Sequence, residues 1–186
     1  VTQRRLPRRG TTPLTLELRL PTDDTGQIIG GLTDGSWVAE VLADRAVFSA
    51  TNPAPFAGRH TLILPATGHA GTPEGDSYGA APVNASGKVS FSGVLADGTA
   101  VSQGAPVARG GEWPFYAALY GGKGSVIGWL TFVTDSPAES LGGLVSWSKP
   151  ASAAAKTYTN GFLTESWMIG STYLPGKRTD SWRKIK

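Results

Sequence analysis

Residues 87–132 constrain the fold of this 186-residue chain more than any other stretch. Over residues 88–93 apolar and polar side chains alternate, which is the period-2 pattern of a strand that buries one face. Asp97-Gly98 follows, and this dipeptide tolerates the positive φ of a tight hairpin turn. A second hairpin is expected from residues 113–120 and 125–133, joined by a glycine-rich turn. Two hairpins without a helical period between them predict an antiparallel sheet.

Similar patterns recur along the rest of the chain. Further strands are expected at residues 14–20, 27–32, 37–42, 46–50, 59–64, 77–83, 141–148 and 161–173, and a helical turn only at 151–156. The 25 glycines and 13 prolines suit many turns between short strands. The predicted fold class is therefore all-β, an antiparallel barrel or two-sheet sandwich of about ten to twelve strands.

Charge is distributed unevenly between the ends and the body of the chain. Four of the 17 basic residues lie in residues 1–10 and five in 176–186, whereas residues 11–175 hold 8 basic and 13 acidic residues. We expect a disordered basic arm over 1–13, one β-barrel or sandwich domain over 14–175, and a basic tail over 176–186. Because the body is acidic, nucleic acid is not an expected partner.

Other classes are restricted by what the sequence lacks. The chain has no cysteine, which excludes disulfides, thiolate chemistry and cysteine-based zinc sites. It has no apolar run of about 18 residues, so no membrane-spanning helix is expected. No signal peptide is visible at Val1, which fits a mature start or a fragment of a larger chain.

A resemblance to a known class of module covers roughly residues 77–175. The residues that carry it are Gly79, Val83, Gly87-Lys88-Val89, Gly93, Leu95-Ala96-Asp97-Gly98-Thr99, Ser102, Phe115-Tyr116-Ala117-Ala118-Leu119-Tyr120, Lys123-Gly124, Gly128-Trp129-Leu130, Phe132 and Trp147-Ser148-Lys149-Pro150. Together they resemble non-catalytic β modules near the C-termini of large secreted bacterial multidomain proteins. The resemblance implies an extracellular location and further domains in a larger chain, and it assigns no catalytic residue.

Catalytic and metal motifs have competing structural explanations. Gly75-Asp76-Ser77-Tyr78-Gly79 fits the Gly-x-Ser-x-Gly elbow of serine hydrolases, but no helix follows it, and His60 and His69 both precede the serine. A glycine-rich turn explains the motif as well. No metal ligand is assigned. The two histidines, His60 and His69, are nine residues apart, and on a strand residues at that spacing face opposite sides.

Acidic residues in the loops leave calcium open as a cofactor. Asp23-Asp24, Glu74, Asp76 and Asp97 could supply oxygen ligands, although none follows the spacing of a calcium loop. Turn aspartates also bond their own backbone. A glycosidase would need two carboxylates in one cleft, and the sequence does not pair any.

Aromatic residues on the expected strands are the candidate ligand-binding residues. These are Trp37, Trp113, Tyr116, Tyr120, Trp129 and Trp147. Aromatic side chains on sheets either fill cores or form flat platforms for ligands. Both faces of the 113–120 and 125–133 hairpin are mostly apolar, which favours burial on both sides and a core position for Trp129. Replacement of a core tryptophan by alanine costs about 3–5 kcal/mol.

The favoured function is a non-catalytic module of a secreted or cell-surface bacterial protein that binds glycan or protein or acts as a structural spacer. The alternative is a secreted hydrolase acting on glycosides or esters. The sequence offers no coherent set of histidine, serine and acid for that chemistry, so the non-catalytic hypothesis is preferred.

Overall fold

The structure is built from strands, because apolar and polar side chains alternate along most of the sequence. The computed structural model describes residues 1–22, 26–135 and 139–173. Within them the strands are β1 (Thr2–Leu6), β2 (Leu14–Arg19), β3 (Gln27–Thr33), β4 (Val38–Asp44), β5 (His60–Leu64), β6 (Ser77–Ala80), β7 (Lys88–Val94), β8 (Ala100–Pro106), β9 (Glu112–Leu119), β10 (Gly124–Phe132), β11 (Leu141–Lys149) and β12 (Phe162–Thr172). A single 3-10 turn, η1 (Tyr120–Gly122), joins β9 to β10.

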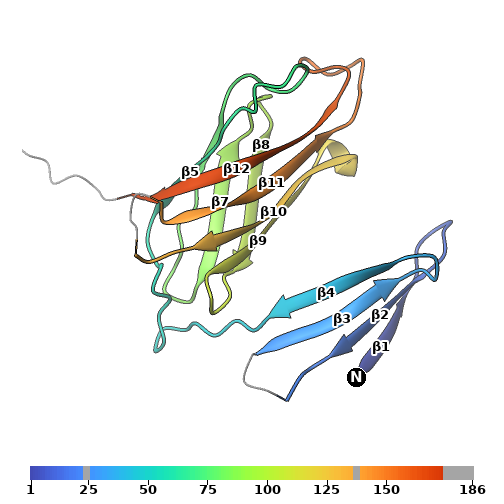
Figure 1. Ribbon diagram of the computed structural model, residues 1–186, viewed down its shortest axis with the longest axis vertical. Coiled ribbons are helices and arrows are strands. Elements are labelled where there is room, and N and C mark those ends of the chain that lie inside the picture. Colours follow the sequence, from blue (N-terminus) through green and yellow to red (C-terminus); the bar gives the residue numbers. More distant parts are fainter. Residues whose placement is uncertain (23–25, 136–138, 174–186) are drawn as a thin grey trace, which may run out of the picture. The chain divides into compact units, whose positions relative to one another are not determined.

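The chain divides into two units, Val1–Val47 and Phe48–Lys186. The first unit is an antiparallel sheet with the order β1-β2-β3-β4, in which each strand pairs with the next along the chain (Figure 1). Leu16 pairs with Leu32, and Leu32 with Ala39, so one face of this sheet is mostly apolar. None of the described residues of this unit is buried.

The second unit is an eight-stranded antiparallel sheet with the order β8-β7-β6-β5-β12-β11-β10-β9. It consists of two four-strand meanders, β5–β8 and β9–β12, joined by the pairing of β5 with β12. The sheet curls until it nearly closes, so that β7 and β8 lie behind β12 and β11 in Figure 1. Gln103 on β8 closes the seam with side-chain bonds to β9, accepting from Trp113 Nε1 at 2.9 Å and donating to the Pro114 carbonyl at 3.0 Å.

The core of the second unit fills the inside of this curled sheet. Alternate residues point inward, and the largest fully buried side chains are Trp113, Phe115, Leu62, Leu130, Leu141, Val89, Val107, Val126 and Val145. Phe91, Trp113 and Phe115 meet edge to face or tilted, with ring centroids 5.1–6.0 Å apart, which is the preferred geometry of aromatic pairs. This packing makes β9 to β11 a rigid support for whatever their outer faces carry.

The sequence prediction of the fold class is confirmed. The described chain is all-β and antiparallel, its larger sheet is barrel-like, and its strand number lies in the expected range. Two local predictions differ from the structure. Residues 46–50 form no strand, because β4 ends at Asp44, and residues 151–156 form no helix.

The predicted domain boundaries also differ from what the structure shows. The segment 1–13, expected to be a disordered arm, contains strand β1. Strand β1 lacks an apolar period, and its backbone pairing with β2 supports it. The stretch 14–175 is not one unit, because the division falls between Val47 and Phe48. The predicted tail 176–186 lies outside the described residues.

Candidate binding face

Large apolar side chains line up on the outer surface of the second unit. A row crosses three neighbouring strands and consists of Trp129 on β10, Leu144 on β11 and Trp167 on β12. Leu144 pairs directly with Trp167. The β10–β11 register, in which Gly128 pairs with Val145 and Thr131 with Gly142, places Trp129 opposite Leu144. Their exposed fractions are 51, 49 and 59%. About half of each side chain thus remains in water on a surface that the strands hold fixed.

A second row runs parallel to the first. Tyr116 pairs with Ile127, Ile127 with Ser146, and Ser146 with Glu165. Tyr116 and Ile127 are both about half exposed. Ser146 Oγ donates a 2.6 Å hydrogen bond to Glu165 Oε1, which places a carboxylate and a hydroxyl at one end of the aromatic row. We call the two rows from Tyr116 to Trp167 the aromatic outer face.

An open groove of about 750 Å³ lies along this face. Trp129, Thr131, Gly142, Leu144, Trp167 and Ile169 contribute to its lining. Gly142 leaves space for the indole of Trp167, because a Cβ at this position would lie only 3.1 Å from Trp167 Nε1. The glycine therefore leaves room for the indole of Trp167 beside β11.

The predicted ligand-binding residues fall in four different environments. Tyr116 and Trp129 lie on the aromatic outer face, whereas Trp113 and Trp147 are buried in the core. Tyr120 is partly buried at the β9–β10 turn, and Trp37 is exposed in the first unit. The expected two-sided burial of the hairpin is wrong, because the inward faces of β9 and β10 fill the core and the outward faces meet solvent.

Sequence reasoning left Trp167 and Leu144 out of the candidate set. Both occupy outward positions of strands whose alternate residues, Met168 and Val145, are buried. The alternation was visible in the sequence. Which set faces outward depends on pairing between β10, β11 and β12, and no local pattern encodes that.

A buried polar cluster closes one end of the core near the turns. Lys149 Nζ donates to Asp97 Oδ2 at 2.7 Å, and Tyr120 Oη donates to the same oxygen at 2.8 Å. Trp147 Nε1 donates in turn to Tyr120 Oη at 3.0 Å, and the Thr99 N–H donates to Asp97 Oδ1 at 3.0 Å. Each of these polar side chains is hydrogen-bonded, because a buried polar group without a partner is energetically costly.

Burial and bonding set the ionisation of this cluster. Burial pushes the pKa of Asp97 upward, but the hydrogen bonds from Lys149, Thr99 and Tyr120 outweigh it and hold the pKa below its ordinary value. Burial, followed by the bond to Asp97, raises the pKa of Tyr120 well above its ordinary value. Asp97 is therefore an anion and Tyr120 a neutral donor near neutral pH, which suits a structural cluster.

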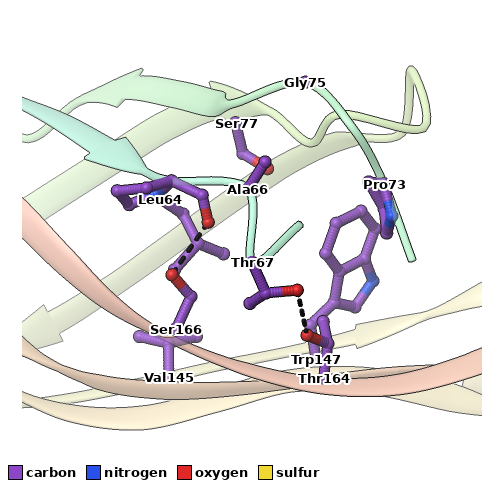
Figure 2. Close-up of a pocket in the computed structure, with 11 residues that line it drawn as sticks. Leu64, Ala66, Thr67, Pro73, Gly75, Ser77, Val145, Trp147, Thr164 and Ser166 are labelled. Carbon is purple, nitrogen blue, oxygen red and sulfur yellow. Dashed lines mark hydrogen bonds between the residues drawn. The ribbon is translucent and has the colours of Figure 1, made fainter. Parts of the chain in front are cut away.

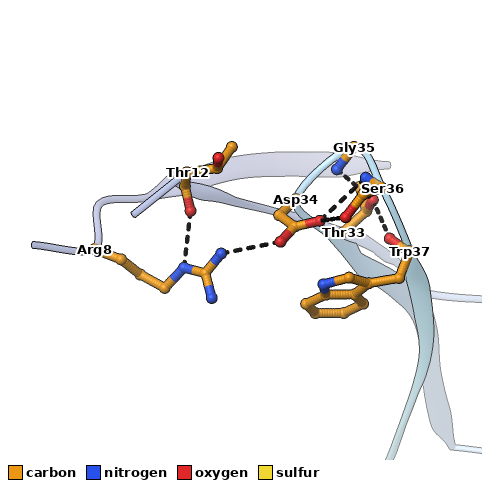
Figure 3. A network of polar contacts seen from close by, with 7 residues as sticks. All are labelled: Arg8, Thr12, Thr33, Asp34, Gly35, Ser36 and Trp37. Carbon is orange, nitrogen blue, oxygen red and sulfur yellow. Dashed lines mark hydrogen bonds and ion pairs between the residues drawn. The ribbon is translucent and has the colours of Figure 1, made fainter. Parts of the chain in front are cut away.

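A second polar network surrounds the β3–β4 turn of the first unit (Figure 3). The N–H and Oγ of Ser36 both donate to Asp34 Oδ1, and Arg8 Nη2 lies 3.2 Å from Asp34 Oδ2. Arg8 also donates to the Thr12 carbonyl, and Thr33 Oγ1 to the Trp37 carbonyl. The Ser36 bonds, followed by Arg8, lower the pKa of Asp34 to about 2. The network fixes a hairpin turn and the entry of the Arg8 segment.

The serine of the elbow-like motif sits beside a small cavity of about 10 Å³ (Figure 2). This volume is about that of one water-sized probe. Ser77 is buried, and its Oγ accepts a hydrogen bond from the Ala96 N–H at 3.0 Å. Both ring nitrogens of His60 are engaged elsewhere, with Ser140 Oγ and the Phe56 carbonyl. These contacts give the hydrolase alternative no support.

The acidic and histidine side chains are the residues that could ligate a metal ion. Within residues 1–22, 26–135 and 139–173, no group of three or more histidine, aspartate or glutamate residues is placed to hold a metal ion. Asp23-Asp24, which the sequence offered as oxygen ligands, lie outside the described residues. Calcium binding stays a prediction of the sequence.

Comparison with known proteins adds no assignment. No family model, no curated protein and no solved structure matches the chain. Across the described residues, no helix has the length and apolar character needed to cross a bilayer. Evidence on function therefore comes from the aromatic outer face itself.

Proposed function

We propose that the second unit is a non-catalytic binding module whose aromatic outer face binds a glycan. The observation that carries the proposal is the row of Trp129, Leu144 and Trp167, three large apolar side chains held about half exposed on adjacent strands. Apolar patches of this kind on soluble proteins mark interaction sites. The rigid core beneath the row means that little ordering is needed on binding.

The chemistry of the row suits sugar rings. The axial C–H groups of a pyranose form an apolar face that stacks on an aromatic ring, and the hydroxyl edge needs polar partners. Trp129 and Trp167 offer the rings, and Thr131, Ser146 and Glu165 lie on the same exposed side of the sheet to meet hydroxyl groups. An apolar surface with a few convergent polar groups is typical of ligand sites.

The spacing indicates an extended ligand. Trp129 and Trp167 are two strands apart, a separation of about 10 Å at ordinary strand spacing. That separation is suited to alternate rings of an extended β-linked chain, whose middle ring can lie flat over Leu144 between the two indoles. The expected ligand class is therefore a β-linked polysaccharide of a cell wall or extracellular matrix, as befits a secreted bacterial module of the type that the sequence resembles.

The test is a glycan-array screen followed by calorimetry and by pull-down on insoluble polysaccharides. We expect the full chain to bind β-linked oligosaccharides and the variants Trp129→Ala and Trp167→Ala each to lose most of the affinity. Trp37→Ala is the matched control, because it removes an exposed tryptophan from the first unit. Absence of binding to every soluble and insoluble glycan, or equal loss in the Trp37 variant, would refute the proposal.

A protein ligand is a second candidate, favoured by a different observation. The apolar surface continues from Ile169 to its paired residue Ile63 and on to Tyr78, all of them exposed. This extension is broader and more aliphatic than a sugar site requires. Under this alternative no glycan binds, and Ile63→Ser weakens the partner protein's binding as strongly as Trp129→Ala does.

A further inference from the structure

The strands that carry the aromatic outer face have acidic residues on their outward side and no basic ones. The structure describes β9 to β12 in full, and the charged residues at their outward positions are Glu112 and Glu165. Glu139, between β10 and β11, is exposed and lines the groove of the same face. Three acidic side chains therefore border one open groove, and no lysine or arginine lies on the outward side of these four strands.

The negative charge of this groove is local and does not follow from the charge of the second unit. Residues 48–173 contain 6 basic and 7 acidic residues, so this part of the chain is close to neutral. A cleft lined by one sign of charge focuses the electric field and concentrates ligands of the opposite sign. The groove therefore favours a ligand that carries positive charge.

Glu165 is placed to contact a sugar ring that stacks on the aromatic row. It lies two residues before Trp167 on β12 and on the same exposed side, so that the two Cα atoms are about 7 Å apart. Ser146 Oγ donates a 2.6 Å hydrogen bond to Glu165 Oε1, which fixes the position of the carboxylate at the end of the second row. An ionised carboxylate accepts several hydrogen bonds, so Glu165 can also accept one from a ligand.

Glu112 has a corresponding place near the other tryptophan of the row. It pairs with Thr131 across β9 and β10, which makes it the diagonal neighbour of Trp129, about 7–8 Å away. Each indole thus has one glutamate as a near neighbour on the surface of the sheet. The faces of aromatic rings attract cations too, so the rings and the carboxylates favour the same ligand charge.

We propose that the glycan bound by the aromatic outer face carries free amino groups, as a β-linked chain of amino sugars does. This inference rests on the proposed function and specifies the charge of the ligand. An ammonium group at the edge of the ring that stacks on Trp167 donates a charge-assisted hydrogen bond to Glu165. Chains with uronate or sulfate groups are rejected, because their charge has the same sign as that of the groove.

The test compares β-linked glucosamine oligosaccharides with their N-acetylated counterparts of the same length, which lack the positive charge. In calorimetric titrations of the full chain at low salt and mildly acidic pH, we expect the amino form to bind several-fold more tightly than the acetylated form. A β-linked uronate chain should not bind. Added salt should reduce the difference between the amino and acetylated forms, because it screens charges at the surface.

Glu165→Gln separates the effect of charge from the effect of shape. It removes the negative charge and keeps a side-chain oxygen that can accept the hydrogen bond from Ser146. We expect this variant to lose most of the preference for the amino form, with its affinity for the acetylated form nearly unchanged. Glu74→Gln, at an exposed glutamate between β5 and β6, is the matched control and should keep the preference. Trp167→Ala should abolish the binding of both forms.

The results distinguish failure of this inference from failure of the proposed function. Equal binding of the amino and acetylated forms, tighter binding of the uronate chain, or a preference that survives in Glu165→Gln overturns the inference and leaves the glycan site in place. Binding of the amino form that persists in Trp167→Ala is ionic adsorption outside the groove and also overturns it. Absence of binding to every one of these chains overturns both, including the case in which only an oligolysine peptide binds.

Discussion

Lys149 Nζ lies 2.7 Å from Asp97 Oδ2, and the two side chains are only 7 and 1% exposed. The lysine ends β11 and the aspartate sits in the β7–β8 turn, so this ion pair ties together two segments that are 52 residues apart. Tyr120 adds its hydroxyl to the same carboxylate while its backbone holds φ at 53°, a left-handed value that is uncommon outside glycine. The cluster thus fixes two turns and one strand end at once.

Breaking this pair should be costly to stability. In Lys149→Met the Asp97 carboxylate stays buried without its cation, and we expect the free energy of unfolding to fall by about 3–5 kcal/mol. Urea unfolding followed by tryptophan fluorescence measures the change. Tyr120→Phe is the companion variant, and it should cost about 1–3 kcal/mol because Asp97 and Trp147 each lose a partner. A loss below about 1 kcal/mol in Lys149→Met would show that the pair is not desolvated.

The depressed pKa of Asp97 predicts a particular pH dependence. A carboxyl whose folded-state pKa lies below its unfolded value of about 3.9 stabilises the fold fully above that value. The stabilisation is lost as the pH falls through the folded-state pKa. The difference in unfolding free energy between the wild type and Asp97→Asn should therefore narrow as the pH falls from about 5 toward 3. A difference that is constant over this range would contradict the assignment.

Asp34 offers a direct titration in the first unit. Its pKa is lowered to about 2, mainly by the hydrogen bonds from Ser36 and to a smaller extent by the hydrogen bond from Arg8. Carboxyl-carbon chemical shifts measured by NMR should give a midpoint near this value, and Ser36→Ala should move the midpoint up toward the ordinary 3.8. Arg8→Ala should move it less. Equal shifts in the two variants would show that the ion pair matters as much as the turn bonds.

The sequence predicted the secondary structure well where one face of a strand is buried and the other is not. Over residues 88–94 the alternation of Val89 and Phe91 with Lys88 and Ser90 is local information, and β7 lies there. Strand β1 was missed because its support is the backbone pairing with β2, which requires no apolar period in β1 itself. The Asp97–Lys149 pair was missed because nothing local links residues so far apart.

The candidate site was predicted only in part, for a related reason. Trp113, Phe115, Tyr116 and Trp129 are all large and aromatic, so composition cannot tell the inner face of the hairpin from its outer face. Tertiary structure decides it: Trp113 on β9 packs against Phe91 on β7 inside the curled sheet, whereas the pairing of β10 to β12 places Trp129 and Trp167 along one groove outside. The outward row depends on the register of three strands, which the sequence does not display.

The last prediction compares Trp129 with Trp113, which belong to the same hairpin but to opposite faces. Trp113 is fully buried and packs on Phe91, Phe115 and Phe132, and its Nε1 donates to Gln103 across the seam. Trp113→Ala should therefore cost about 3–5 kcal/mol, as expected for a large aromatic in a core.

Trp129, by contrast, leaves 51% of its side chain in water. Its replacement by alanine creates no cavity in the core, so we expect a cost of about 1 kcal/mol or less. Urea unfolding of the two variants, measured side by side with calorimetric titration of the glycan that the array identifies, separates the two roles. Trp113→Ala should lower stability, whereas Trp129→Ala should lower affinity at nearly unchanged stability. A Trp129→Ala variant that unfolds as easily as Trp113→Ala would place the indole in the core and remove the basis for a binding role.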